Sequence, residues 1–562
     1  MTWIGGIFSK VNTSRDDLTK KVAVMTETAC PANESWNVTC PYRVSSILDE
    51  PRGQALAKVS LSVRGRPAED IYTYYPEKLA LVYDGHLYGL RDTVAELPGV
   101  QHRVNETDAR SLVHLLAESA ANLEQRVSRA LIDLDGDYAL AVSDTNQIVV
   151  SRDRSGTRPL YFGQNNRLAA FASNKKPLWK IGLGKVRPLR AGNFALFDHE
   201  GVTVGKVSSV RKKSIEIKNM AQAVNAYEQS LCSAVRKRLA KVDPIRKVGL
   251  LLSGGVDSCL LAKLVRDAAS SLGMETIVFS VGLPGSPDMD FAKEFARELG
   301  MRHKMKILSV DAVGEYIPKV IEAIEDSDFV QVETGIGLYA AIDMASQDGI
   351  SVLFSGQGPD ELWGGYTWYP KVLGRDGRHE LCRRMREDFT RVDIETLDRE
   401  NKIAMAHGVE LFFPYLDAEV VNVAMTVASE LKVTSEEDRL GKHPHRRLAI
   451  KMGISEKYAN REKLAIQHGT GIHNVLDDIA RKNGFGPCLV KDIGYKSKEI
   501  TTEKMGSSAR YGYRYTDKRL WQVPQHVQLF FQALAYRKGL LDKSVWDRVG
   551  HFLEKAGIPP ES

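Results

Sequence analysis

One segment, Ser253-Gly254-Gly255-Val256-Asp257-Ser258, constrains the fold of this chain more than any other part of its sequence. It follows an apolar run, 248–252, that is typical of a buried strand, and it precedes a stretch with helical periodicity. The adjacent glycines permit a tight turn and let the backbone approach an anion closely. Free N–H groups and the dipole at the start of a helix favour a phosphate there. The segment therefore predicts a phosphate-binding loop between a strand and a helix.

The polar side chains of this loop refine the prediction. The hydroxyls of Ser253 and Ser258 add hydrogen-bond donors for a phosphate. Asp257 is a poor neighbour for a phosphate unless a cation lies between them, so it implies Mg2+. The spacing differs from G-x-x-x-x-G-K-[ST], which disfavours a Walker-type nucleotide-binding protein. A glycine-rich turn that binds nothing is the simpler alternative, and it fits a whole motif poorly.

A second acidic turn has the same layout. The apolar run 352–354 ends in Ser355-Gly356-Gln357-Gly358, followed by Pro359, Asp360 and Glu361. Side chains at the carboxyl ends of neighbouring parallel strands meet at one edge of a sheet. We therefore predict that Asp360 faces Asp257 and is a second magnesium ligand. Taken alone, this segment would suit a plain turn equally well.

The pattern of apolar residues predicts an α/β protein in three parts. Residues 1–210 show short alternating segments typical of strands and hairpins. Residues 220–480 alternate buried strands with helices, which indicates βαβ units and a parallel sheet. A basic stretch, 208–219, links these parts. Residues 481–562 form an extension of unknown role that is polar at first and ends in two short helices, at 523–539 and 543–557.

Composition excludes several classes of protein. The 562 residues contain no apolar run of about 20, the length that spans a bilayer. The N-terminus lacks the pattern of a signal peptide, so we expect a cytoplasmic protein without a membrane partner. Six scattered cysteines without a CxxC pair disfavour a zinc site and a disulfide framework. A net charge of +6 is too small to indicate a nucleic-acid partner.

Several motifs together resemble glutamine-dependent asparagine synthetases. Ser253–Ser258 resembles the PP-loop of ATP pyrophosphatases, and the resemblance continues through residues 281–288, 355–361, 399–417 and 461–471. Residues 1–210 are similar to that family's class II glutamine amidotransferase domain. The resemblance implies an αββα domain of the Ntn-hydrolase type, then a PP-loop domain of the adenine nucleotide alpha hydrolase type. It ends near residue 480.

The resemblance also implies ATP and Mg2+ as cofactors, and small-molecule partners, a carboxylate and an amine. ATP would adenylate the carboxylate, and the amine would displace AMP. By position, Asp257 and Asp360 would carry Mg2+ and pyrophosphate, while Arg461 and Lys463 would contact phosphates. Adenosine and ribose would be held by four residues of the two turns and of the strand between them: Leu252, Val281, Ser355 and Gly356.

The resemblance also implies roles for residues near the reacting carboxylate of the substrate. Glu410 would orient a basic group beside the acyl-adenylate, with a turn-capping carboxylate as the alternative. Gln357 stands where the family often has glutamate. Lys442 is our candidate for the lysine expected before Arg461, and His445 is the second candidate.

The predicted amidotransferase domain departs from its family. Glutaminases of this family begin Met-Cys-Gly-Ile, whereas this chain begins Met1-Thr2-Trp3-Ile4. An expected Asn-Gly-Glu triplet reads Asp84-Gly85-His86, and Asp108 remains as a ligand for the amine of glutamine. These changes predict an inactive or repurposed domain. In the alternative, Thr2 is the nucleophile, activated by its own amine.

Departures in the synthetase part leave the substrate open. Residues 330–333 read Val-Gln-Val-Glu where many members carry an arginine, and Phe412 replaces another common arginine. Fewer arginines weaken the case for aspartate, whose carboxylates need partners. The first hypothesis is an asparagine synthetase that uses ammonia. The second is an amide ligase for another carboxylate and amine, similar to beta-lactam synthetases and lasso-peptide cyclases.

Two further hypotheses concern other classes. A non-catalytic scaffold is disfavoured by the intact loops and Lys463. An RNA-modifying PP-loop enzyme would use the basic tail 496–519, where three tyrosines alternate with arginines and offer rings that stack on bases. A surface strand explains that pattern more simply. The same tail offers a cap for the site or a homodimer contact.

Overall fold

The computed structural model describes the chain as two compact units, Met1–Val210 and Arg211–Ser562. Each unit has its own sheets and core, and the two are described separately. Within them, the structure describes residues 2–11, 14–29, 42–49, 54–61, 71–74, 79–88, 108–117, 122–144, 146–207, 216–242, 247–497 and 523–559.

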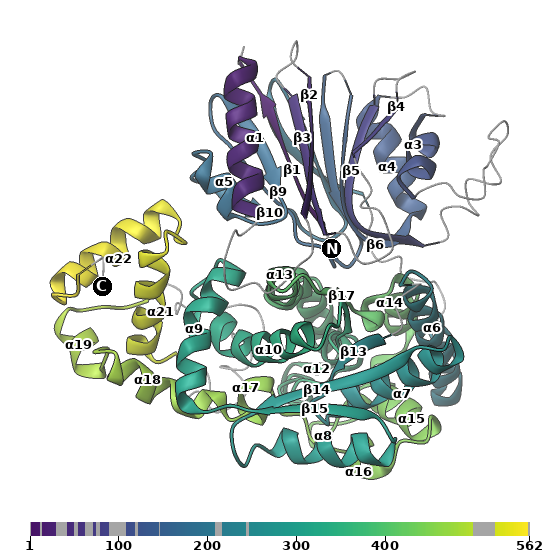
Figure 1. Cartoon of the computed structure of the whole chain (residues 1–562). Helices are drawn as coiled ribbons and strands as arrows, with labels where there is room; N and C mark the ends of the chain where they lie inside the picture. The colour runs from purple at the N-terminus through teal and green to yellow at the C-terminus, as the bar shows by residue number, and fades with distance from the viewer. Residues whose placement is uncertain are drawn as a thin grey trace. The chain divides into compact units, whose positions relative to one another are not determined.

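The first unit contains two antiparallel sheets, each with six strands in the described ranges (Figure 1). Strand β1 lies inside the first sheet and pairs with β3 on one side and β9 on the other, with Ile4 opposite Lys58 and Gly5 opposite Ala172. The first sheet runs β10 (Val186–Pro188), β8 (Tyr161–Gln164), β9 (Leu168–Ala172), β1 (Thr2–Ser9), β3 (Gln54–Leu61), β2 (Tyr42–Asp49). The second runs β12 (Gly201–Lys206), β11 (Asn193–Asp198), β7 (Ile148–Arg152), β6 (Asp135–Ser143), β5 (Leu79–Tyr88), β4 (Tyr72–Tyr74).

The two sheets pack face to face through a mainly apolar core. In this core, Ile4 and Phe8 of β1 pack with Val82 of β5 and with Ala139 and Ala141 of β6. All five side chains are fully buried. A second core lies between the other face of the β5 sheet and two helices. The helices of this unit are α1 (Arg15–Ala29), α3 (Asp108–Ala117), α4 (Leu123–Asp133) and α5 (Lys176–Lys180).

Helices therefore cover the outer face of each sheet. Helices α1 and α5 pack on the β1 sheet, and α3 and α4 pack on the β5 sheet (Figure 1). The order helix, sheet, sheet, helix confirms the predicted αββα architecture.

The second unit is built on a parallel sheet. Within the continuously described residues 247–497, five strands lie in the order β15 (Arg302–Ile307), β14 (Glu275–Gly282), β13 (Lys247–Leu251), β16 (Val352–Phe354), β17 (Glu410–Phe412). Central strand β13 pairs in parallel with both neighbours, so that Leu250 lies opposite Val278 and Phe354. The loops after β13 and β16 consequently leave the same edge of the sheet, side by side. This confirms the predicted parallel-sheet domain.

Helices surround this sheet and complete the unit (Figure 1). The α-helices are α6 (Met220–Leu239), α7 (Val256–Ser271), α8 (Pro287–Glu298), α9 (Val310–Ile324), α10 (Phe329–Gln347), α11 (Pro359–Trp363), α12 (Tyr369–Phe389), α13 (Asp398–Ala406), α14 (Ala418–Thr426), α15 (His443–Lys451), α16 (Glu456–Ala459), α17 (Ile466–Gly469), α18 (Leu476–Lys482), α19 (Pro487–Asp492), α21 (Gln525–Arg537) and α22 (Lys543–Lys555). Shorter turns are the π-helix η3 (Asp393–Leu397) and the 3-10 helices η4 (Pro414–Leu416), η5 (Ser429–Leu431) and η6 (Ile472–Val475).

The two helices predicted near the C-terminus are present as α21 and α22, and α21 is part of the second unit's core. Gln528 of α21 accepts a hydrogen bond from the N–H of Phe329 at 2.9 Å and donates one to the carbonyl of Ser327 at 2.6 Å. These bonds tie the extension to the start of α10. The tyrosine–arginine repeat at 510–515 lies outside the described residues, as do residues 208–215 of the predicted linker. None of the described helices has the length and hydropathy of a membrane span.

Candidate active site

The predicted phosphate loop connects β13 to α7. Gly254 adopts φ +73°, and a Cβ atom there would lie 2.6 Å from the Cβ of Phe291, so both conformation and space require glycine. Gly255 is the N-cap of α7. Ser258 donates to the carbonyl of Gly255 at 3.0 Å, and its hydroxyl lies 3.2 Å from that of Ser253. These contacts hold the turn closed, and the first N–H groups of α7 have no partner within the helix.

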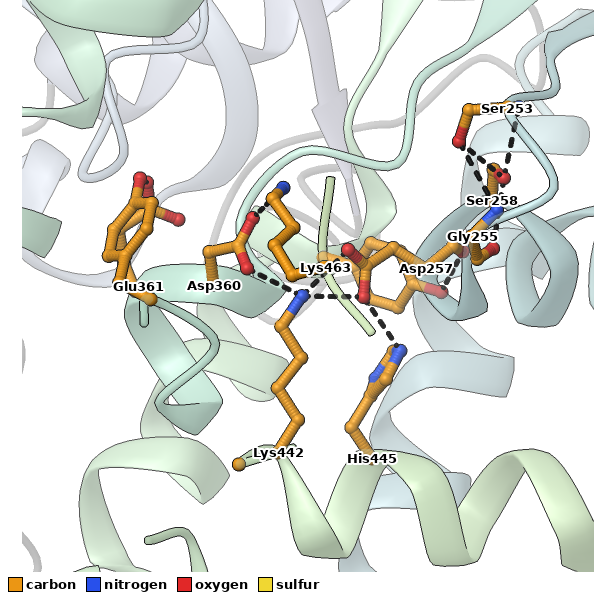
Figure 2. Close-up of polar contacts among 12 residues, drawn as sticks. Ser253, Gly255, Asp257, Ser258, Asp360, Glu361, Lys442, His445 and Lys463 are labelled. Atoms are coloured by element: carbon orange, nitrogen blue, oxygen red, sulfur yellow. Dashed lines mark hydrogen bonds and ion pairs between the residues drawn. The ribbon is translucent and has the colours of Figure 1, made fainter. Parts of the chain in front are cut away.

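Two carboxylates and two lysines form the centre of the site (Figure 2). The Nζ atom of Lys442 lies 2.7 Å from Asp257 Oδ2 and 2.7 Å from Asp360 Oδ1. Lys463 pairs with the other oxygen of Asp360. The structure thus brings Asp257 and Asp360 to opposite sides of one ammonium group. We call Asp257, Asp360, Lys442 and Lys463 the carboxylate–lysine cluster.

The cluster favours the charged forms of its two aspartates and of Lys463. Burial alone would raise the pKa of Asp257, but Lys442 and His445 outweigh it, and the pKa lies well below its usual range. The pKa of Asp360 is also lowered, because Lys442 and Lys463 outweigh its burial. Burial would lower the pKa of Lys463, but the two carboxylates raise it.

The backbone of Lys442 is unusual. It has φ +54°, in the left-handed region, and it is the N-cap of α15. Among the described residues, only Glu325 shares a positive φ without being glycine. A non-glycine residue in this region costs about 1–3 kcal/mol and is typical of functional sites. Gly365 gives Lys442 its space, since a Cβ atom there would lie 2.0 Å from Lys442 Cε.

His445 also reaches the cluster, as Figure 2 shows. Its Nε2 atom lies 3.1 Å from Asp257 Oδ1, and its Nδ1 atom lies 2.8 Å from the hydroxyl of Tyr227. Both rings are fully buried, and burial lowers the pKa of His445. The sequence had suggested His445 only as a substitute for Lys442, and it gave no indication of Tyr227.

Arg461 lies beside the phosphate loop. It donates to the carbonyl of Ser253 at 3.1 Å and to Asp288 Oδ1 at 2.6 Å. Asp288, at the end of the segment 281–288, was not among the predicted site residues. Arg461 and Lys463 thereby approach the loop and the cluster from one segment.

The residues expected to hold adenosine lie at the ends of three adjacent strands. Leu252 follows β13, Val281 lies in β14, and Ser355 and Gly356 follow β16; Leu252, Val281 and Ser355 are buried. The backbone of Leu252 accepts a hydrogen bond from Ser280 at 2.5 Å. A Cβ atom on Gly356 would lie 3.4 Å from the N–H nitrogen of Ser258, so this turn passes close to the phosphate loop.

Gln357 is bound to a carboxylate that the sequence did not single out. Its amide donates to Glu400 Oε1 at 2.6 Å, and Ser355 donates to Glu400 Oε2 at 2.8 Å. Glu400 is fully buried, and burial raises its pKa despite the adjacent Arg399. The sequence did not predict this contact. Glu400 lies on α13, distant in the chain from Ser355 and Gln357, and only the fold brings it to them.

A further buried acid follows Asp360 directly. Glu361 accepts a hydrogen bond from the hydroxyl of Tyr366 at 2.5 Å. Burial and the neighbouring Asp360 raise the pKa of Glu361 to about 8. Both effects favour the protonated, uncharged form of this carboxyl.

The remaining predicted residues of the second unit lie on neighbouring elements. Glu410 begins β17, and its N–H donates to the carbonyl of Ser351 at 2.8 Å. Phe412 is fully buried in the same strand. Glu333 of α10 pairs with His473, with its Oε2 atom 2.8 Å from Nδ1.

In the first unit, the structure brings Thr2 and Asp84 together. The backbone nitrogen of Thr2 donates to Asp84 Oδ1 at 3.2 Å. Gly85 has φ +114°, and a Cβ atom there would lie 1.8 Å from the carbonyl of Asp137. The indole of Trp3 lies across Gly5 and donates to Asn174 Oδ1 at 2.9 Å. Asp108 is the first residue of α3.

Comparison with known families accounts for most of the chain. Residues 226–382 and 374–534 match the family model described as asparagine synthase. Residues 68–180 match the model described as glutamine amidotransferase domain. The first match extends past residue 480, the predicted limit of the resemblance, and it includes most of α21.

Individual relatives are moderately similar. A Methanocaldococcus jannaschii protein described as asparagine synthetase [glutamine-hydrolyzing] 1 is 29% identical over 485 residues, which are 78% of this chain and 86% of the relative. Asparagine synthetase [glutamine-hydrolyzing] 2 of Arabidopsis thaliana is 27% identical over 474 residues, 81% of this chain and 72% of the relative. Among solved structures, the glutamine phosphoribosylpyrophosphate amidotransferase of B. subtilis shares 13% identity with a TM-score of 0.29, covering 75% of this chain and 92% of its own.

Proposed function

Because the chain belongs to the asparagine synthase family and is an ATP-dependent ligase, we propose that it forms an amide bond through an acyl-adenylate. A carboxylate oxygen of the substrate attacks the α-phosphorus of ATP, and the bond to the β-phosphate oxygen breaks. Pyrophosphate leaves. An amine then attacks the acyl carbon, loses a proton, and displaces AMP.

The observation that carries this proposal is the carboxylate–lysine cluster beside the phosphate loop. Two carboxylates that share one ammonium group, next to free N–H groups at a helix start, suit a site for a metal-bound polyphosphate. The proposal places the triphosphate along the loop, with its β and γ phosphates over the cluster. Lys463 and Arg461 would stabilise the charge that develops on the leaving pyrophosphate.

The donor set fits Mg2+. This ion is usually held by one or two carboxylates together with substrate phosphates, and Asp257 and Asp360 are two carboxylates within reach of a single point. They would hold the ion, which neutralises phosphate charge when bound. Lys442 occupies the space between them and would turn toward the phosphates.

The strand ends beside the loop would bind the rest of the nucleotide. Buried Leu252 and Val281 offer an apolar wall for adenine, while Ser355 and Gly356 lie where ribose would continue toward the loop. Gln357 and Glu400 would then face the acyl group, and Glu410 would orient a basic group there. Residues 220–480 are proposed as the ATP pyrophosphatase domain, with 481–562 as an extension.

The best named reaction is the conversion of aspartate to asparagine with ammonia. A second candidate is a specialised amide ligase of the same family, similar to a beta-lactam synthetase or a peptide cyclase. The pair Glu333–His473 favours it, because residues 330–333 carry a carboxylate and no arginine where many family members have an arginine-bearing segment next to the acceptor. Fully buried Phe412 removes a second basic partner.

For residues 1–210 we propose an amidotransferase-like domain that does not hydrolyse glutamine. The carboxylate of Asp84, 3.2 Å from the Thr2 nitrogen, would repel the oxyanion formed when a nucleophile attacks an amide carbonyl. The indole of Trp3 fills the space above Gly5.

Product analysis tests the proposal. The protein is incubated with Mg·ATP, aspartate, and either ammonium or glutamine, and AMP, pyrophosphate, asparagine and glutamate are quantified. AMP, pyrophosphate and asparagine in the ammonium sample support an asparagine synthetase. AMP formation that requires a different carboxylate supports the specialised ligase. Release of ADP and orthophosphate would contradict both.

A further inference from the structure

A buried chain of polar contacts runs from α6 to the phosphate loop. Tyr227 of α6 contacts His445 of α15, and His445 contacts Asp257, at 2.8 Å and 3.1 Å respectively. Tyr227 and His445 are fully buried, so neither ring exchanges these contacts for water. The contacts thereby connect α6, α15 and the phosphate loop, which are distant in sequence, and the chain ends at Oδ1 of Asp257.

The order of donors in this chain follows from chemistry. The carboxylate of Asp257 can only accept, so the Nε2 atom of His445 carries the proton. In a neutral imidazole the Nδ1 atom is then an acceptor, and the hydroxyl of Tyr227 must donate to it. One arrangement of protons suits all three groups: Tyr227 donates to His445 Nδ1, and the protonated Nε2 atom lies 3.1 Å from Asp257 Oδ1.

Aromatic packing fixes the imidazole in this position. Tyr415 lies edge-on to His445 with ring centroids 5.5 Å apart, and its hydroxyl donates to the backbone carbonyl of Asp257 at 2.7 Å. Tyr227, the other partner of His445, packs on Trp363 with ring centroids 4.3 Å apart. Trp363 ends α11, the short helix that also carries Asp360. The aromatic cluster therefore connects the two elements that present the carboxylates.

We propose that Tyr227 and His445 are positioning residues, which hold the carboxylate of Asp257 in the orientation that receives the magnesium–pyrophosphate part of ATP. This inference rests on the proposed function and adds residues to it. Hydrogen-bond partners of a ligating carboxylate fix its orientation, and their loss typically costs about 10–100-fold in metal affinity or activity. Lys442 supplies the positive charge beside Asp257, whereas His445 would hold one carboxylate oxygen of Asp257, Oδ1, in place.

The test is equilibrium binding of a non-cleavable ATP analogue, α,β-methylene ATP, to the full chain by calorimetry. Each variant is titrated in Mg2+ and again in EDTA. For His445→Leu we expect affinity to fall about 10–100-fold in Mg2+ and to change little in EDTA. His445→Gln should recover most of it, because the glutamine amide can donate from near the Nε2 position. The affinity of Tyr227→Phe in Mg2+ should lie between that of the wild type and that of His445→Leu.

Tyr495→Phe is the matched control, since it also removes a buried hydroxyl, one that donates to Gln532 at 2.9 Å in the C-terminal helices. Its affinity should equal that of the wild type. Equal losses in Mg2+ and EDTA, or wild-type affinity in Tyr227→Phe and His445→Leu, would overturn the inference alone. If His445→Leu does not fold, as shown by the loss of a cooperative melting transition, the affinity of Tyr227→Phe alone tests the inference. A wild type that does not bind the analogue would overturn the proposed function as well.

Discussion

Asp257 and Asp360 are bridged by a single ammonium group, whose nitrogen lies 2.7 Å from an oxygen of each. The two aspartates come from loops after β13 and β16, neighbours in the sheet but 103 positions apart in the chain (360 minus 257). Parallel pairing of these strands brings both loops to one edge. The sheet therefore assembles the site that the proposed reaction requires.

Neutralising either aspartate should remove the proposed activity. Asp257→Asn and Asp360→Asn each delete one charge that would face magnesium and pyrophosphate, and we expect turnover to fall by at least about 100-fold. ATP–pyrophosphate exchange with radiolabelled pyrophosphate measures this directly. Asp290→Asn, on the exposed side of α8, is the control and should exchange like the wild type. Full turnover in Asp257→Asn would show that the site is assigned wrongly.

Adding one methyl group at Gly365 should disable the site without changing a charge. The new Cβ would lie 2.0 Å from Lys442 Cε and 2.1 Å from Asp360 Oδ1, so both side chains must move. A misplacement of about 1 Å costs about 100-fold in rate, and Gly365→Ala should lose about that much turnover. Gly314→Ala, whose Cβ would meet only Ile479 at 3.9 Å, should keep its activity. Equal activities would mean that the position of Lys442 is unimportant.

The protonation of Glu361 should appear in the pH dependence of stability. Its pKa is raised from 4.5 to about 8 in the folded chain, mainly by burial and then by Asp360. Between these values the folded chain keeps a proton that the unfolded chain has lost, so this group's contribution to stability falls as pH rises. Glu361→Gln cannot ionise and still accepts from Tyr366. Relative to the wild type, its melting temperature should rise progressively between pH 5 and pH 8.

A constant difference in melting temperature across that range would show that Glu361 does not retain a proton in the folded chain. Glu419→Gln is the control, since Glu419 is exposed and its substitution should leave the pH dependence unchanged.

Removal of the Asp417 carboxylate should destabilise the second unit. Asp417 Oδ2 lies 2.7 Å from Arg238 NH1, both side chains are almost fully buried, and Asp417 also caps α14. Breaking a buried pair by removing one partner costs about 3–5 kcal/mol, because the other charge is left uncompensated. Asp417→Ala should therefore shift urea unfolding, followed by circular dichroism, to lower concentration. A variant as stable as the wild type would show that Arg238 and Lys237, which both pair with Asp417, do not require its carboxylate for folding.

Glutamine should not replace ammonium as the nitrogen source. The Asp84 carboxylate beside Thr2 opposes an oxyanion, so glutamate release from glutamine should stay at the background rate. Thr2→Ala should then leave ammonium-dependent turnover unchanged. Glutamate release by the wild type that is lost in Thr2→Ala would show instead that Thr2 is a nucleophile.

The sequence predicted those parts of the molecule that local patterns encode. The strand, glycine turn and helix around Ser253 were predicted because apolar runs and paired glycines act within a few residues. The parallel sheet followed from the alternation of such runs. Asp360 was placed near Asp257 by a general property of parallel sheets, and the structure brings both to Lys442.

Contacts between distant segments could not be predicted in this way. Tyr227 and His445 are 218 residues apart, and no spacing rule connects a tyrosine on one helix with a histidine on another. Glu400 meets Ser355 and Gln357 only because α13 packs beside the end of β16. The roles assigned to individual residues by resemblance stay predictions until the variants above are measured.

The charge balance of the carboxylate–lysine cluster has a kinetic consequence. Each aspartate of the cluster is paired with a lysine, and Arg461 is paired with Asp288, so the main charges that would meet a ligand are already neutralised by partners. Paired charges of opposite sign exert little long-range pull on a polyanion, because their fields cancel at distances larger than their separation and salt screens the remainder beyond about 8 Å. The cluster itself should thus contribute little to the dependence of the Mg·ATP encounter rate on ionic strength, and its selectivity for the nucleotide should arise after contact, when the lysines exchange their carboxylates for phosphates.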